Sequence, residues 1–226
     1  MLRDSLPQYQ LPKPNDLSIP ANHEVEQILL FIDNHVTKFP AYYKSIKDTD
    51  RENRISDFLV HHFQLCKVEY NQDYFPFDFR KNPTQEKSGK ETDVGVYVLT
   101  RDRKPSPIIE FEAKRFSESS RNEQYVYGDR GGIERFKRSY HSSHLKVCGM
   151  FAYVQSRTIE EWFNKVNGWL INQFNTNTDS SIEWLENEQL LKYTSLSAVE
   201  KYFSKHTRKS LNDSISLWHY FIDLTS

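Results

Sequence analysis

Two acidic residues and a lysine alternate along one apolar stretch of the chain. Glu110, Glu112 and Lys114 occur in the run Ile-Ile-Glu-Phe-Glu-Ala-Lys. Residues two apart share a face of an extended strand, so we expect these three side chains to point the same way. Charged groups on an otherwise apolar strand are costly to cover unless they are paired or bind something. The pattern therefore predicts a site on this strand.

A second predicted strand, residues 93–99, precedes this run and begins with Asp93. If the two strands pair as a hairpin-like ribbon, Asp93 can approach Glu112 or Glu110, with Lys114 alongside. Carboxylates suit Mg²⁺, which takes hard oxygen ligands and keeps several waters. A lysine near the attacking water can orient it, help to deprotonate it, or stabilise charge on phosphorus. Such a set is typical of metal-assisted phosphodiester hydrolysis.

This arrangement resembles the motif of the PD-(D/E)XK nucleases, the restriction-endonuclease-like superfamily. Asp93 matches the family aspartate, and Glu112-Ala113-Lys114 matches the (D/E)-x-K element. Thr92 stands where the motif has a proline, which is not the chemical part. The resemblance implies that Asp93, Glu112 and the backbone carbonyl of Ala113 bind Mg²⁺, for which Mn²⁺ can substitute.

The family often adds a glutamate from a preceding core helix, and Glu52 fits that role. Glu52 lies one turn before Ile55, on the face that also carries Leu59. The alternative for Glu52 is an ordinary surface acid paired with a nearby arginine, and Asp57 is a rival that lies off this face. The catalytic residues implied by the resemblance are Glu52, Asp93, Glu112 and Lys114.

Hydrophobic spacing predicts a mixture of helices and strands along the whole chain. Helical periodicity begins at Glu24, near Asp50 and at residue 158, and residues 68–79, 93–99, 108–114, 148–154 and 215–222 indicate extended segments. We therefore expect an α/β fold, with helices and strands in one domain over residues 1–226. The resemblance covers residues 50–155 and implies a restriction-endonuclease-like mixed sheet flanked by helices. An N-terminal arm and helix (1–45) and a C-terminal helical and strand extension (156–226) would complete it.

Positive charge must be local if this chain binds a polyanion, because 30 Lys and Arg residues face 31 Asp and Glu residues. Two basic clusters stand out, one after Gly131-Gly132 and one at residues 205–209. A solvated surface is the alternative interpretation of both clusters. The residues predicted to hold nucleic acid are Arg135, Lys137, Arg138, His206 and Arg208.

Other chemistries fit the sequence less well. His141, His144 and Cys148 could suggest zinc, but a fourth ligand is not evident. Glycine patterns typical of serine hydrolases, P-loop enzymes and dinucleotide-binding enzymes are missing from the sequence. The alternative for Glu110, Glu112 and Lys114 is the solvated face of an edge strand with cross-strand salt bridges.

Composition bounds the setting in which this chain works. The two cysteines are too few for a disulfide framework, and no apolar run approaches the length of a membrane span. We expect a cytoplasmic protein with no membrane partner. The resemblance implies a DNA endonuclease of a prokaryotic restriction, defence or repair system, with DNA favoured over RNA and a homodimer or partner protein left open. The alternative is a non-catalytic, nuclease-like nucleic-acid-binding or scaffolding subunit of a larger complex.

Overall fold

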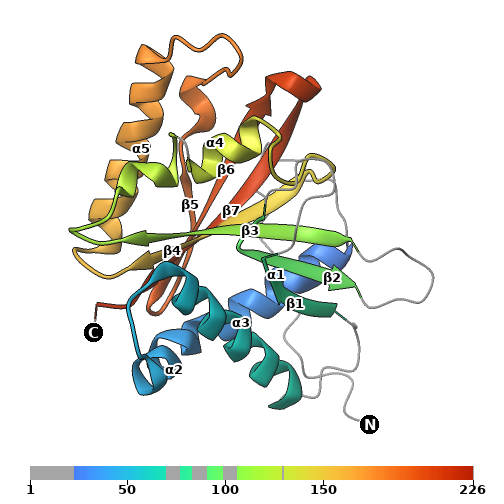
Figure 1. The fold of residues 1–226 in the computed structure, drawn as a ribbon, viewed down its shortest axis with the longest axis vertical. Helices are drawn as coiled ribbons and strands as arrows, with labels where there is room; N and C mark the ends of the chain where they lie inside the picture. Colours follow the sequence, from blue (N-terminus) through green and yellow to red (C-terminus); the bar gives the residue numbers. More distant parts are fainter. Residues whose placement is uncertain (1–22, 70–76, 83–90, 99–105, 129, 226) are drawn as a thin grey trace.

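The computed structural model describes residues 23–69, 77–82, 91–98, 106–128 and 130–225. Their strands form one sheet of seven strands in the order β1-β2-β3-β4-β7-β6-β5 (Figure 1). The bounds are β1 Phe77–Lys81, β2 Val94–Val98, β3 Pro107–Phe116, β4 Val147–Val154, β5 Leu191–Leu196, β6 Val199–Arg208 and β7 Asp213–Asp223. Strand β4 is parallel to β3 and to β7, and the other pairs are antiparallel. The prediction of an α/β fold with a mixed sheet is confirmed.

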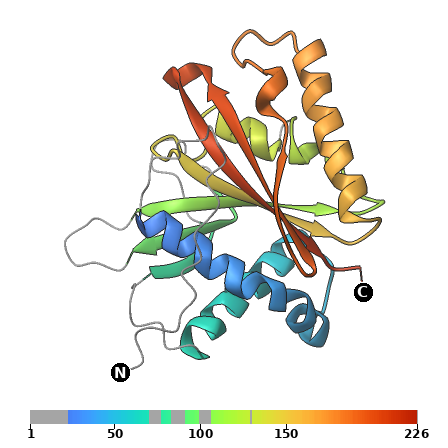
Figure 2. The ribbon, with the colours of Figure 1, turned by 180° about the vertical axis from the view of Figure 1, so that it is seen from behind.

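Helices cover both faces of this sheet. Helices α1 (His23–His35), α2 (Phe39–Ile46) and α3 (Glu52–Glu69) lie against one face. Helices α4 (Gly132–Lys137) and α5 (Ile159–Thr176) lie against the other, as the two opposite views show (Figures 1 and 2). Each face has its own apolar core. The sheet therefore separates two layers of helices, and a side chain on a strand belongs to one layer or the other.

The first layer follows from the spacing of apolar residues on α3. Ile55, Leu59 and Phe63 recur every four residues and are fully buried, in the same core as Phe111 and Phe151 of the sheet. Burial of this face fixes the first turn of α3, with Glu52, beside the sheet.

Strand β3 shows the expected alternation. Ile109, Phe111 and Ala113 enter the core under α1 to α3. The ladder between β2 and β3 ends at the pair Val94–Phe111, although β3 continues to Phe116. The last residues of β3 therefore extend beyond the end of β2.

The C-terminal part differs from the prediction. Residues 205–208, expected as a basic surface cluster, belong to strand β6, which lies between β5 and β7. The sequence analysis found β7 but neither β5 nor β6. These strands alternate polar and apolar residues irregularly, so their pattern is weak. The C-terminal extension is therefore an integral half of the sheet.

Two expected segments cannot be compared fully with the structure. The N-terminal arm, residues 1–22, lies outside the described residues. The extended segment predicted at 68–79 begins instead as the last turn of α3 and ends in β1, and residues 70–76 between them are not described. No helix in the described part of the chain is long and apolar enough to cross a bilayer.

Candidate functional site

The structure brings all four predicted catalytic side chains together at the end of β2. On β3, the Lys114 Nζ lies 3.3 Å from Glu112 Oε2. The same ammonium lies 3.8 Å from Glu52 Oε1, at the start of α3. Asp93 Oδ2 accepts the backbone N–H of Ala113 at 2.6 Å. The cluster thus joins β2, β3 and α3, as the motif resemblance implies.

The short β2 strand creates this arrangement. Beyond Val94 the backbone of β2 no longer pairs with β3, and the Asp93 side chain takes the place of a strand by accepting the Ala113 N–H. The N–H and C=O of one strand residue point toward the same neighbour, so the Ala113 carbonyl faces the Asp93 side as well. Glu52 does the same for the next turn of the ribbon, since its Oε2 accepts the Arg115 N–H at 2.8 Å.

Burial makes this cluster electrostatically unusual. Glu112 is 1 % exposed, whereas the side chains of Lys114 and Glu52 keep 13 % and 33 % of their surface exposed. Burial, together with the neighbouring Glu112 carboxylate, raises the pKa of Asp93 to about 6. Burial also raises the pKa of Glu52, against the attraction of Lys114. The acids therefore hold their negative charge at a free-energy cost.

Lys114 is the cation that the acids share. Burial alone would lower the pKa of Lys114, but the carboxylates of Glu112, Asp93 and Glu52 outweigh it and raise that pKa. Lys114 therefore stays protonated at neutral pH.

Two further residues of the site escaped the sequence analysis in this role. Arg135 Nη1 lies 3.3 Å from Glu112 Oε2, and His141 Nδ1 lies 3.4 Å from Glu112 Oε1. Arg135 was expected on nucleic acid, and His141 was considered only as a zinc ligand. Their one sequence signal is position, because both follow β3 in the connection to β4, which crosses the sheet next to that strand.

The donor set fits a hard divalent cation in part. Asp93, Glu112 and the Ala113 carbonyl offer oxygen ligands, and Mg²⁺ often takes only one or two carboxylates. Within the described ranges, no group of three or more His, Cys, Asp or Glu side chains is arranged to hold a metal. The raised pKa of Asp93 nevertheless indicates excess negative charge that a cation would relieve.

The solvated edge-strand alternative is wrong for this strand. β3 lies between β2 and β4, and Glu110 and Glu112 are buried. Glu110 has a different setting from Glu112, since it accepts hydrogen bonds from the hydroxyls of Thr92 and Ser142. The rival Asp57 also lies apart from the cluster and pairs with Lys81 at 2.7 Å.

Three of the five residues predicted to hold nucleic acid are buried, which corrects that expectation. The side chains of Lys137, His206 and Arg208 have no exposed surface. Lys137 pairs with Glu188, which His206 also contacts, and Arg208 forms two hydrogen bonds with Asp213. Their charges serve the interior because strand β6 and helix α4 turn these side chains inward, so they cannot touch a polyanion.

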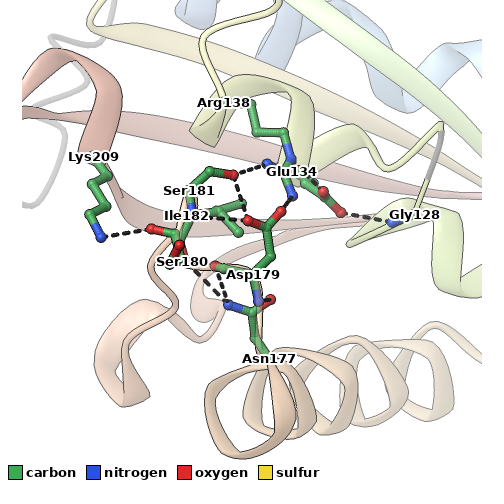
Figure 3. Close-up of polar contacts among 9 residues, drawn as sticks. All are labelled: Gly128, Glu134, Arg138, Asn177, Asp179, Ser180, Ser181, Ile182 and Lys209. Atoms are coloured by element: carbon green, nitrogen blue, oxygen red, sulfur yellow. Dashed lines mark hydrogen bonds and ion pairs between the residues drawn. The ribbon is translucent and has the colours of Figure 1, made fainter.

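Arg138 is a structural anchor (Figure 3). Its guanidinium donates to Glu134 at 2.6 Å, to Asp179 at 2.6 Å and to the Ser181 hydroxyl at 2.7 Å. These bonds join α4 to the loop after α5, where Lys209 also donates to the Ser180 carbonyl. Two carboxylates thus neutralise Arg138, which leaves little charge for a phosphate.

The residues of the zinc alternative do not gather. Cys148 is buried within β4, His141 contacts Glu112, and the His144 ring lies 3.4 Å from the Pro107 carbonyl oxygen. Comparisons with protein-family models, with curated proteins and with solved structures each found no match.

Proposed function

We propose that this protein is a Mg²⁺-dependent nuclease of restriction-endonuclease-like fold that hydrolyses phosphodiester bonds of DNA. The observation that carries the proposal is the convergence of Glu52, Asp93, Glu112 and Lys114 where β2 ends beside β3. The element order supports it, since α3, β1 to β3, α4 and β4 follow the superfamily order of helix, strands, helix and strand.

Asp93, Glu112 and the Ala113 carbonyl would hold the metal. Bound there, Mg²⁺ would polarise a phosphoryl oxygen and lower the pKa of a water. The N–H of Ala113 fixes the Asp93 carboxylate, and Arg135 and His141 fix that of Glu112. Ligand orientation by such partners supports metal affinity.

Lys114 and Glu52 would act on the reacting groups. The ammonium of Lys114 is protonated and partly exposed, so it can stabilise the negative charge that develops on phosphorus. The raised pKa of Glu52 makes its carboxylate a better acceptor for a proton from the attacking water. Both side chains are more exposed than Glu112, as groups that meet a substrate must be.

One observation favours the second candidate, a non-catalytic nucleic-acid-binding or scaffolding subunit. Lys114 and Arg135 already lie within 3.3 Å of Glu112. Two cations on one carboxylate can neutralise the cluster without a metal, as in a structural ion-pair network.

Cleavage assays separate the two candidates. Supercoiled plasmid, single-stranded DNA and RNA are incubated with the protein in Mg²⁺, in Mn²⁺ and in EDTA. The proposal expects cleavage of DNA with either metal and none in EDTA. DNA binding without cleavage under every condition would favour the non-catalytic subunit.

A further inference from the structure

A cavity of about 310 Å³ opens beside the candidate active site. Glu52 and Lys114 belong to its wall, so whatever occupies the cavity lies next to the acidic cluster. The volume is at the small end of ligand sites, which span roughly 300–1,000 Å³. Such a space suits one small polar unit rather than a large apolar molecule.

Four arginines line this cavity: Arg51, Arg115, Arg121 and Arg130. They differ from the other described arginines, each of which forms an ion pair with a described carboxylate, namely Arg54, Arg80, Arg135, Arg138, Arg157 and Arg208. The four cavity arginines form no ion pair with any described acidic residue. Every described arginine without such a partner therefore lines this one cavity.

The wall of the cavity is partly preorganised. Arg115 donates to the Ser120 hydroxyl at 3.1 Å and to the Asp50 carbonyl at 3.0 Å, which fixes its guanidinium in place. Glu52 is the one carboxylate in this lining, and its Oε2 is already held by the Arg115 N–H. An anion in the cavity would thus meet positive charge on several sides.

We propose that this arginine cavity binds a backbone phosphate of the DNA strand beside the scissile bond. The inference rests on the proposed function for the identity of the strand. Guanidinium groups recognise phosphate oxygens through paired, charge-assisted hydrogen bonds. A phosphate held here would place the adjoining sugar-phosphate unit against Lys114 and Glu52. The cavity thereby takes over the role that the sequence analysis gave to Lys137, Arg138, His206 and Arg208.

Binding to a short fluorescein-labelled DNA duplex in EDTA tests the cavity without any hydrolysis. The double variant Arg121→Ala/Arg130→Ala removes two exposed arginines of the wall. Its matched control, Arg80→Ala/Lys192→Ala, removes the same charge from side chains that pair with Asp78 and Glu200 elsewhere on the surface. Circular dichroism confirms that each variant is folded.

We expect the cavity variant to bind at least about tenfold more weakly at low salt, and the control within about twofold of the wild type. The slope of log affinity against log salt should become shallower by about one for each phosphate that the variant no longer neutralises. Equal weakening in both variants, unchanged binding by the cavity variant, or no DNA binding by the wild type would overturn the proposal.

The same samples keep this inference separate from the nuclease proposal. If the wild type cleaves DNA with Mg²⁺ and the cavity variant binds and cleaves normally, the cavity proposal fails while the nuclease stands. If the wild type binds through these arginines but never cleaves, the cavity stands while the nuclease fails.

Discussion

Two clusters of charged side chains lie along the same layer of the fold, and each joins a buried glutamate to a lysine. The first is the candidate site around Glu112 and Lys114. The second, here called the interior network, links Lys137 to Glu188 at 2.7 Å and continues through His206, Ser204, His219 and Tyr125. Helix α4 serves both, because Arg135 reaches Glu112 and Lys137 reaches Glu188.

Access distinguishes the two clusters. Every member of the interior network is at most 1 % exposed, whereas Lys114 and Glu52 open into the arginine cavity. The balance of charge differs as well. Burial alone would raise the pKa of Glu188, but His206 and Lys137 lower it to about 2, while the pKa of Asp93 is raised to about 6. The satisfied cluster stabilises the fold, and the strained, accessible one is suited to chemistry.

The largest expected effect is on cleavage. Lys114→Met keeps the length of the side chain but removes the charge that would stabilise the transition state. We expect the cleavage rate at saturating Mg²⁺ to fall about a thousandfold. Mg²⁺ affinity, measured by calorimetry, should be kept or increased, since a competing cation is gone. Weaker Mg²⁺ binding with an unchanged rate per bound metal would contradict the role of Lys114.

The interior network should dominate stability. Glu188→Gln leaves Lys137 charged and buried without its counterion, so we expect a loss of about 3–5 kcal/mol in the free energy of unfolding at pH 7. Because the pKa of Glu188 is lowered from 4.5 to about 2, its contribution is present above pH 4.5 and is lost as the pH falls toward 2. Urea denaturation across this range measures both. A loss at pH 7 below about 1 kcal/mol would show that the pair is not buried as described.

Ser204 tests the middle of the same network. Its hydroxyl lies 2.7 Å from the Nε2 atoms of both His206 and His219. Ser204→Ala leaves two buried rings without this partner, and we expect a loss of about 1–3 kcal/mol in urea denaturation. Ser195→Ala, on the surface, is the control and should change stability by less than about 0.5 kcal/mol.

The smallest effect has the opposite sign. The pKa of Asp93 is raised from 3.8 to about 6, so its ionisation weakens the fold as the pH rises through 6. Asp93→Asn should therefore stabilise the metal-free protein at pH 7, by about 1 kcal/mol because Asp93 keeps some contact with solvent. The gain should vanish near pH 4, where the wild-type carboxyl is protonated in both states. A variant less stable than the wild type at pH 7 in EDTA would remove the strain from this account.

The site could be predicted from the sequence because its geometry is local. Glu112 and Lys114 share a strand face, and Asp93 begins the strand that pairs with β3, so strand periodicity alone brings them close. Glu52 required the amphipathic spacing of α3. Arg135 and His141 could not be placed, because their approach to Glu112 depends on how the connection between β3 and β4 folds over the sheet.

The basic residues show why charge patterns failed where periodicity succeeded. A run such as Lys205-His206-Thr207-Arg208 has the same composition whether it is a solvated loop or a buried strand. Its setting is decided by Glu188 and Asp213, which are separated from it in the sequence but lie against it in the fold. The arginines of the cavity were equally hidden, since no single cluster in the sequence contains Arg51, Arg115, Arg121 and Arg130.

Plasmid cleavage by Glu112→Gln and Glu110→Gln tests the central claim most directly. Both glutamates lie on the same face of β3, are buried and become neutral amides of the same shape, but only Glu112 belongs to the cluster with Asp93 and Lys114. With Mg²⁺, the account predicts cleavage by the wild type and by Glu110→Gln, and a fall in cleavage by Glu112→Gln to the level seen in EDTA. Cleavage by Glu112→Gln at the wild-type rate would contradict it.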